Sequence, residues 1–362
     1  MGNHLFFIAR ICLPISTANL KIENSNIHIQ YVKNETKYMG IKNLNKYLYE
    51  KCGKTSISKK HLSEISGKTI VIDTSIYLYQ FVGENALMEN MYLFISILRL
   101  YNITPIFIFD GKPPPEKNEL LRKRYMDKKD AQRKFNELQL LLANMSPEER
   151  RLAELEMNNL KRQFVRVYDD DIKKVKELME AYNITYFNSP NEADDLCVYM
   201  VKTGKAWGCM SDDMDMFVYG CPYIIRNLSL MKHTITLYKT EEVLQDLKLS
   251  EKEFREILTI SGTDYNIHSN TSLHETMKWF NDYKKYKEKC ETKDMKYYEF
   301  YIWLMKNTKY IKDYRELINI FCMFQGKNYT KYEGMNFDLL SEIPQDTKKI
   351  HTLMENEGFV FA

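Results

Sequence analysis

The sequence predicts an α/β fold in which helices flank a mostly parallel central sheet. Two short runs, Thr69–Asp73 and Pro105–Asp110, are rich in β-branched or aromatic residues, and each ends in an aspartate. A helix-length segment separates them, which is typical of a parallel strand–helix–strand unit. The alternation continues downstream, where Ile184–Phe187 and Trp207–Ser211 predict strands on either side of a helix at Asn191–Thr203.

The rest of the chain is mostly helical in pattern. Residues 118–183 read as long helices interrupted once, where Ser146 can cap a helix and Pro147 can occupy its first turn. Tyr223–Ile225 and Thr234–Tyr238 can form a hairpin, and the segment that follows the hairpin is again helical.

Composition and charge narrow the class of protein. With 44% hydrophobic and 28% charged residues among 362, the chain can bury a core, which excludes global disorder. Seven scattered cysteines without a C-x-x-C pair favour a reducing compartment. The net charge of +3 hides a local asymmetry: residues 112–134 hold nine basic and four acidic residues, whereas residues 192–215 hold six acidic residues and two lysines. This asymmetry suits a metal-dependent enzyme that acts on a polyanion.

Seven carboxylates fall where predicted elements end or, for Glu192 and Asp194, where a predicted helix starts. Several follow strands whose carboxyl ends meet at one edge of a parallel sheet, which is where ligand sites form in such sheets. Carboxylates that converge there repel one another unless cations neutralise them, and two hard divalent ions would do so. A pair of ions can activate water and straddle a scissile phosphate, so no serine, cysteine or histidine nucleophile is needed. The seven are Asp73, Asp110, Glu192, Asp194, Asp213, Asp215 and Asp264.

Each motif also has a structural interpretation. An aspartate at a strand end, such as Asp73 or Asp110, is more often a helix cap than a ligand. The aspartates at residues 212–215 could form a solvated turn, and the basic run at 112–134 could be a solvated helix face. The conjunction of several carboxylate-bearing segments at one edge of the sheet favours a functional site.

Over roughly Met39–Asp264, the chain resembles the flap endonucleases of the XPG-type structure-specific 5′ nuclease family. Six motifs carry the resemblance in order, with Asp194 standing where the family has a second glutamate. They are Met39-Gly40-Ile41, Val71-Ile72-Asp73, Phe109-Asp110-Gly111-Lys112-Pro113-Pro114, Ser189-Pro190-Asn191-Glu192-Ala193-Asp194, Ser211-Asp212-Asp213-Met214-Asp215 and Gly262-Thr263-Asp264-Tyr265.

The resemblance implies roles for individual residues. The seven carboxylates would bind two Mg²⁺ ions per subunit, with Mn²⁺ as a substitute. Lys117 and Arg124 would contact the scissile phosphate, and Tyr79 would stack on the terminal base. Gly40 and Lys112 would lie against the DNA. The helices at 118–166 would form an arch through which a single strand passes.

The polar, weakly patterned residues before Met39 and the resemblance after it together predict an organisation of the chain. Residues 1–38 would be an N-terminal extension without fixed structure, residues 39–145 and 146–265 the N-terminal and internal nuclease regions, and residues 266–362 a helical C-terminal region. Three departures stand out. Thirty-eight residues precede Met39, the family's helix-two-turn-helix is unrecognisable in 266–283, and no basic tail or sliding-clamp motif ends the chain.

The expected activity is therefore divalent-metal-dependent cleavage of branched or flapped DNA in replication or repair. We expect a monomer without membrane attachment that works in the nucleus, or at a cytoplasmic replication site if the protein is viral. Two alternatives stay open: an RNA-directed 5′ exonuclease or PIN-like ribonuclease, and a catalytically silent module that binds DNA junctions.

Overall fold

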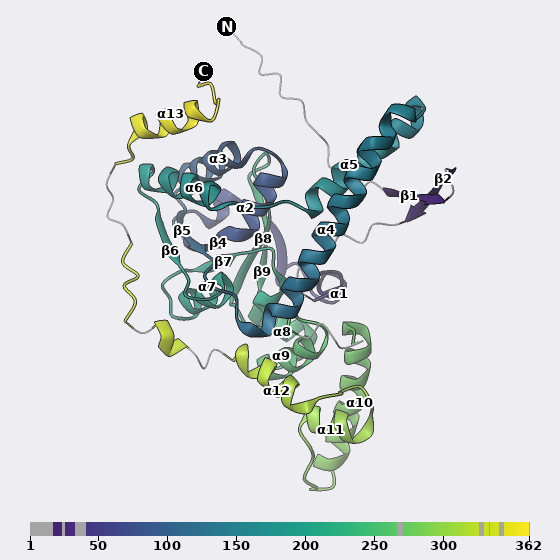
Figure 1. Ribbon diagram of the computed structural model, residues 1–362. Coiled ribbons are helices and arrows are strands. Elements are labelled where there is room, and N and C mark those ends of the chain that lie inside the picture. The colour runs from purple at the N-terminus through teal and green to yellow at the C-terminus, as the bar shows by residue number, and fades with distance from the viewer. Residues whose placement is uncertain are drawn as a thin grey trace. The chain divides into compact units, whose positions relative to one another are not determined.

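A computed structural model describes residues 17–23, 26–32, 41–265, 271–325, 329–332, 334–339 and 344–361 (Figure 1). The chain divides into two compact units. The larger unit is built from residues 38–123 and 166–362, and the smaller unit from residues 1–37 and 124–165. Gly40, one of the expected DNA-binding residues, lies outside the described residues.

A mixed sheet forms the centre of the larger unit. Within the described residues it has seven strands in the order β3-β9-β8-β7-β4-β5-β6. The strands from β8 to β6 are parallel to their neighbours, whereas β9 pairs antiparallel with β8 and with β3. The prediction of a mostly parallel sheet is therefore confirmed. The strands are β3 (Ile57–His61), β4 (Thr69–Asp73), β5 (Thr104–Phe109), β6 (Thr185–Asn188), β7 (Gly208–Met210), β8 (Tyr223–Ser229) and β9 (Thr234–Lys239).

Helices cover both faces of this sheet (Figure 1). One face packs against α2 (Thr74–Gly83), α3 (Leu87–Leu100) and α6 (Asp169–Ala181), and α13 (Thr347–Asn356) packs on α6. The other face packs against a larger group of helices that includes the C-terminal region. That group comprises α1 (Leu44–Lys51), α7 (Ala193–Lys202), α8 (Thr240–Leu247), α9 (Glu251–Ile260), α10 (Leu273–Glu291), α11 (Phe300–Asn307) and α12 (Tyr314–Met323).

The two central strands divide their side chains between these faces. Ile70 and Ile72 of β4 and Phe107 of β5 belong to the core beneath α2 and α3, whereas Val71 and Ile106 belong to the core on the opposite face. Because successive side chains of a strand point to opposite faces, a run that is buried throughout needs helices on both sides. This explains why β4 and β5 read as continuous apolar runs.

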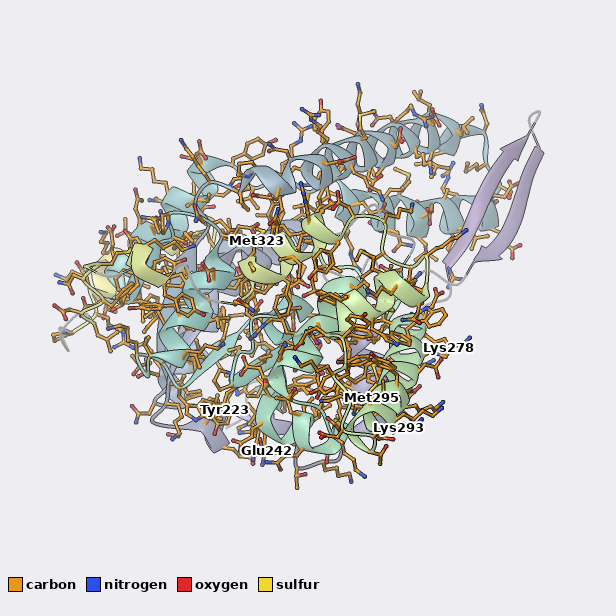
Figure 2. The ribbon with its side chains drawn as sticks, turned by 90° about the horizontal axis from the view of Figure 1, so that it is seen from below. Tyr223, Glu242, Lys278, Lys293, Met295 and Met323 are labelled. Atoms are coloured by element: carbon orange, nitrogen blue, oxygen red, sulfur yellow. The ribbon has the colours of Figure 1, made fainter. Side chains whose placement is uncertain are left out.

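The C-terminal helices form an aromatic-rich extension of the second core. Phe280 of α10 packs edge-to-face on Phe300 of α11 at a centroid distance of 5.0 Å. Figure 2 shows this region from below, with Lys278 near the start of α10, and Lys293 and Met295 in the turn that follows it. Among the described residues, no helix combines the length and apolar character needed to cross a membrane.

A helical hairpin makes up most of the smaller unit. The helix α4 (Asn118–Leu141) starts in the larger unit and continues into this one, where a short 3₁₀ turn at Leu142–Asn144 leads to α5 (Pro147–Gln163). Ser146 caps α5, as the sequence predicts, and it forms a capping box with Glu149. The strands β1 (Thr17–Glu23) and β2 (Asn26–Val32) pair antiparallel in the same unit. These two strands are not predicted from the sequence, and the domain boundaries stay a prediction.

Candidate active site

The carboxyl ends of β4 and β5 place the first two aspartates. Asp73 ends β4 and is 5% exposed, and its Oδ2 accepts a hydrogen bond from the Ser211 hydroxyl at 3.2 Å. Asp110 follows β5, where its two carboxylate oxygens accept hydrogen bonds from the Ser75 hydroxyl at 2.5 Å and the Ala193 amide at 2.7 Å. Asp110 therefore fixes the first residues of α2 and α7 while it remains exposed.

The segment after β7 contributes a buried pair of aspartates. Asp213 is 8% exposed and Asp215 is 3% exposed, and the Asp213 carboxylate accepts a hydrogen bond from the Asp215 amide at 2.9 Å. The Ser211 hydroxyl accepts one from the Asp213 amide at 3.2 Å, so this hydroxyl links the segment to Asp73. Asp212 instead accepts a hydrogen bond from the Asn227 amide of β8 at 2.8 Å. The solvated-turn interpretation is wrong for Asp213 and Asp215, because both are buried.

The start of α7 brings Glu192 and Asp194 to the same region. Glu192 is the N-cap residue of α7, and Asp194 lies in the first helical turn. Burial raises the pKa of Asp194 well above its ordinary value, and the nearby charges of Asp73 and Asp213 raise it further. The sheet edge and α7 therefore bring these carboxylates close enough to repel one another.

The same repulsion affects two further aspartates. Burial, with the charges of Asp110 and Asp213, raises the pKa of Asp73 to about 8. Burial, with Asp213 and Asp264, raises the pKa of Asp215 well above its ordinary range. Carboxylates that are dry and close together hold their protons unless cations are supplied.

Lys117 supplies one such cation from the protein itself. Its ammonium Nζ lies 2.5 Å from Oε1 of Glu192 and 3.5 Å from Oδ2 of Asp264, and the residue is 6% exposed. Burial alone would lower the pKa of Lys117, but the charges of Glu192, Asp194 and Asp264 outweigh it and raise the pKa. Lys117 is therefore held among the carboxylates, and its expected contact with a phosphate stays a prediction.

The remaining expected site residues that the structure describes are Lys112, Tyr79 and Arg124. Lys112 is exposed in the loop after β5, and Tyr79 is 47% exposed on α2. Arg124 lies on α4, seven residues after Lys117, in the smaller compact unit. The structure therefore brings Lys117 to the carboxylates, and the roles of Lys112, Tyr79 and Arg124 stay predictions.

Tyr265 is a site residue that the sequence analysis did not assign. Its hydroxyl donates a hydrogen bond to Oε2 of Glu192 at 2.5 Å, and its ring centroid lies 5.1 Å from Nζ of Lys117. The ring also packs edge-to-face on Phe324, beyond α12, at 5.5 Å. The available signal was its position directly after Asp264, in a motif from which only the aspartate was selected.

Gly111 explains part of the Asp110-Gly111-Lys112 motif. Its amide donates to the carbonyl oxygen of Asn191 at 2.6 Å, which ties the loop after β5 to the loop before α7. A Cβ at this position would lie 2.1 Å from the carbonyl oxygen of Ser189. Only glycine permits this backbone approach, which keeps Asp110 close to α7.

The donor chemistry of these residues fits hard divalent cations, which prefer carboxylate oxygens. Asp215 adds a specific sign, because its buried Oδ1 has no hydrogen-bond partner. Within the described part of the chain, no group of three His, Cys, Asp or Glu side chains already stands in an arrangement that could hold a metal ion.

Comparisons with known proteins agree with the motifs. Residues 39–131 match the model of the XPG N-terminal domain, and residues 183–264 match that of the XPG I-region. Nucleases of this family are generally dependent on divalent metals. The catalytic core of Rad2 in complex with a DNA substrate superposes with a TM-score of 0.59 at 20% identity, covering 88% of this chain and 95% of that one. At that identity the match shows the fold.

Curated relatives match this chain at a higher sequence identity than the Rad2 core does. Flap endonuclease 1 of Candida glabrata is 32% identical over 247 residues, which are 63% of this chain and 61% of the relative. Flap endonuclease 1 of Methanococcus aeolicus is 30% identical over 237 residues, which are 59% of this chain and 68% of the relative. The chain spans about 60% of the length of the first curated relatives that it matches. The motifs, the fold and these matches together show that the chain belongs to the XPG family of nucleases, with flap endonuclease 1 among its relatives.

Proposed function

We propose that this protein is a divalent-metal-dependent, structure-specific 5′ nuclease that hydrolyses phosphodiesters at DNA flaps and junctions in replication or repair. One observation carries the proposal. Mutually repelling carboxylates gather at the carboxyl edge of the sheet, beside the buried ammonium of Lys117. Asp73 at the end of β4 and the pair Asp213 and Asp215 after β7 are buried, and Asp194 of α7 is partly buried. A binding module without catalysis would gain stability by losing this repulsion, so the arrangement favours an enzyme.

The carboxylates would hold two Mg²⁺ ions, with Mn²⁺ as a substitute. Bound there, the ions would activate water and neutralise the scissile phosphate. The proposed ligands are Asp73, Asp110, Glu192, Asp194, Asp213, Asp215 and Asp264.

The protein's own residues set the geometry. The Ser211 hydroxyl orients Asp73 and the backbone of Asp213, and the Ser75 hydroxyl orients Asp110. Lys117 would bind the scissile phosphate and stabilise the charge that develops there. The two hydrogen bonds of the Ser211 hydroxyl are buried, so Asp73 and the backbone of Asp213 need little rearrangement when substrate binds.

DNA contacts outside the carboxylates complete the proposal. Arg124 would join Lys117 at the phosphate, Tyr79 would stack on a base, and Gly40 and Lys112 would lie along the backbone. The α4–α5 hairpin would act as the arch for a single strand. We propose that the protein acts as a monomer in the nucleus, or at a cytoplasmic replication site if it is viral.

The decisive experiment compares two neighbouring aspartates on matched substrates. Flap, hairpin and single-stranded DNA and single-stranded RNA are incubated with Mg²⁺ and the wild type, Asp213→Asn or Asp212→Asn. Asp213→Asn should abolish turnover and retain DNA binding, because it removes a proposed ligand and reduces repulsion toward phosphate. Asp212→Asn is the control, since an asparagine oxygen can still accept the hydrogen bond that the Asn227 amide donates.

Three results would contradict the proposal. The first is undiminished flap cleavage by Asp213→Asn. The second is cleavage by the wild type in the presence of a chelator. The third is a preference for RNA, which would support the 5′ exonuclease alternative.

A further inference from the structure

The ammonium of Lys117 lies against two of the proposed metal ligands, Glu192 and Asp264. Lys117 ends a 3₁₀ turn, Pro115–Lys117, directly before α4. From there its side chain reaches Oε1 of Glu192 at 2.5 Å and Oδ2 of Asp264 at 3.5 Å. Both acceptors are carboxylates from the proposed ligand set, so one lysine joins two segments that lie 72 residues apart in the chain.

The surroundings of this ammonium are closed. The side chains of Lys117, Glu192 and Asp264 are 8%, 17% and 11% exposed. The Tyr265 ring faces the ammonium at 5.1 Å, and the Tyr265 hydroxyl uses the second oxygen of Glu192 at 2.5 Å. The hydroxyl of Tyr265 takes up one acceptor position of Oε2 of Glu192, so a further cation meets less competition at Oε1. Lys117 holds that oxygen.

A lysine and a divalent ion make competing demands on such oxygens. A hard divalent ion binds carboxylate oxygens directly at about 2.0–2.6 Å, which leaves no room for an ammonium hydrogen bond along the same direction. Two cations around one carboxylate also repel each other in a site with little water. A metal ion on Oε1 of Glu192 would therefore compete with the ion pair seen here.

We propose that Lys117 is an exchangeable counterion, which holds Glu192 and Asp264 before metal binds and is displaced from them by the metal. This inference rests on the proposed nuclease function, and it adds a second role to that lysine. Displacement moves the ammonium out of the carboxylate cluster, and the ammonium then becomes available to a phosphate. The enzyme thereby avoids an uncompensated cluster in its metal-free state.

Lysine suits this exchange better than arginine. Its ammonium is a compact point charge on a flexible stem, whereas a guanidinium binds carboxylates through a rigid two-pronged fork. The single short contact, to Glu192, can break without the loss of a bidentate pair. A permanent structural ion pair would have no need of this property.

The first test measures metal affinity in the absence of DNA. Isothermal titration calorimetry with Mn²⁺ compares the wild type, Lys117→Met and the control Lys59→Met, which removes an exposed lysine of β3. Lys117→Met should bind Mn²⁺ about tenfold more tightly although it cleaves DNA more slowly. Lys59→Met should bind as the wild type does.

The second test uses the wild-type protein, and it decides the matter if Lys117→Met fails to fold. An amine-acetylating reagent is applied with and without saturating Ca²⁺, and labelling of Lys117 relative to Lys59 is measured by mass spectrometry. Displacement predicts that Ca²⁺ increases the labelling of Lys117 severalfold. This measurement also separates displacement of the Lys117 ammonium from a long-range effect of its charge on metal affinity.

The outcomes separate the two proposals. Wild-type metal binding with unchanged or reduced labelling of Lys117 would overturn the exchange and leave the nuclease assignment intact. Mn²⁺ binding by Lys117→Met that is equal to or weaker than that of the wild type would do the same. Absence of metal binding to both proteins would overturn the proposed function, and this inference with it.

Discussion

The hydroxyl of Tyr265 donates a hydrogen bond to Oε2 of Glu192, with 2.5 Å between the two oxygens. The residue directly after Asp264 therefore orients the N-cap residue of α7, 73 positions earlier in the chain. Through its ring, Tyr265 also connects this carboxylate to Phe324. The position of Glu192 consequently depends on how the C-terminal helices pack.

Tyr265→Phe should slow single-turnover cleavage by about tenfold and leave the fold intact. The change removes only the hydroxyl, and a hydrogen bond to a charged group contributes about 1.5–3 kcal/mol. Tyr332→Phe is the matched control, because its hydroxyl donates at 3.2 Å to Asp195, which is not a proposed ligand. If both variants cleave at the same rate, Tyr265 does not position Glu192 for the reaction.

Gly111→Ala should destabilise the protein by at least about 1–3 kcal/mol and reduce cleavage. The new methyl group would lie 2.1 Å from the carbonyl oxygen of Ser189 and 2.7 Å from that of Pro190, so backbone must move. Gly53→Ala is the control, since the nearest atoms to a Cβ there are 3.7 Å away. Chemical denaturation of the two variants measures the difference, and equal midpoints would contradict the expectation.

Glu256 should make stability depend on pH. Burial, together with the charge of Glu299, raises its pKa from 4.5 to about 7, although Lys252 acts in the opposite direction. As the pH rises from 4.5 to 7, the unfolded chain releases this proton while the folded protein keeps it. Glu256 therefore lowers the stability progressively over this range, and the reduction is complete above pH 7.

Glu256→Gln removes that penalty. Its stability advantage over the wild type should grow between pH 5 and pH 8 by on the order of 1–3 kcal/mol. Denaturant unfolding at both pH values measures it, with the exposed Glu288→Gln of α10 as control. An advantage that stays constant across this pH range would show that Glu256 does not retain its proton in the folded protein.

The α4–α5 hairpin should loosen on its own when its small core is weakened. Leu138, 6% exposed, packs with Ala153 and Leu160, whereas the nearby Leu140 is 80% exposed. A buried Leu→Ala change removes about 2–5 kcal/mol. Leu138→Ala should therefore speed amide hydrogen exchange in residues 124–163 and leave β4 and β5 unchanged, while Leu140→Ala alters neither. Faster exchange throughout the sheet would show that the hairpin and the sheet unfold together.

The central strands could be predicted because their signals are local. Thr69–Asp73 coincides with β4, and the predicted helix break at Ser146 is present. The edge strand β3, Ile57–His61, was missed because its two lysines hide the apolar pattern and its partner, β9, lies far along the chain. Edge strands often carry such charges, which discourage pairing with other molecules.

In the candidate site, too, the residues with local signals could be predicted and those placed by tertiary packing could not. The carboxylates could be selected because strand ends and a helix start determine their positions. The ion pair of Lys117 with Glu192 could not be predicted, since it depends on how η2, the Pro115–Lys117 turn, packs against α7. Tyr265 was missed for a similar reason: its partner is set by tertiary packing, and no local pattern identifies it.

The division of β4 between two cores has a consequence for how this protein can vary. Inserting or deleting one residue in Thr69–Ile72 would shift the register of β4 by one residue. Either the side chains before Asp73 would then point to the opposite face of the sheet, or Asp73 would move along the sheet edge. Length changes should therefore be tolerated in the loop between η1 (Leu62–Ile65) and β4, and rejected within the strand. A library of single-codon insertions across residues 62–76, selected for folded protein, would show an abrupt boundary at Thr69.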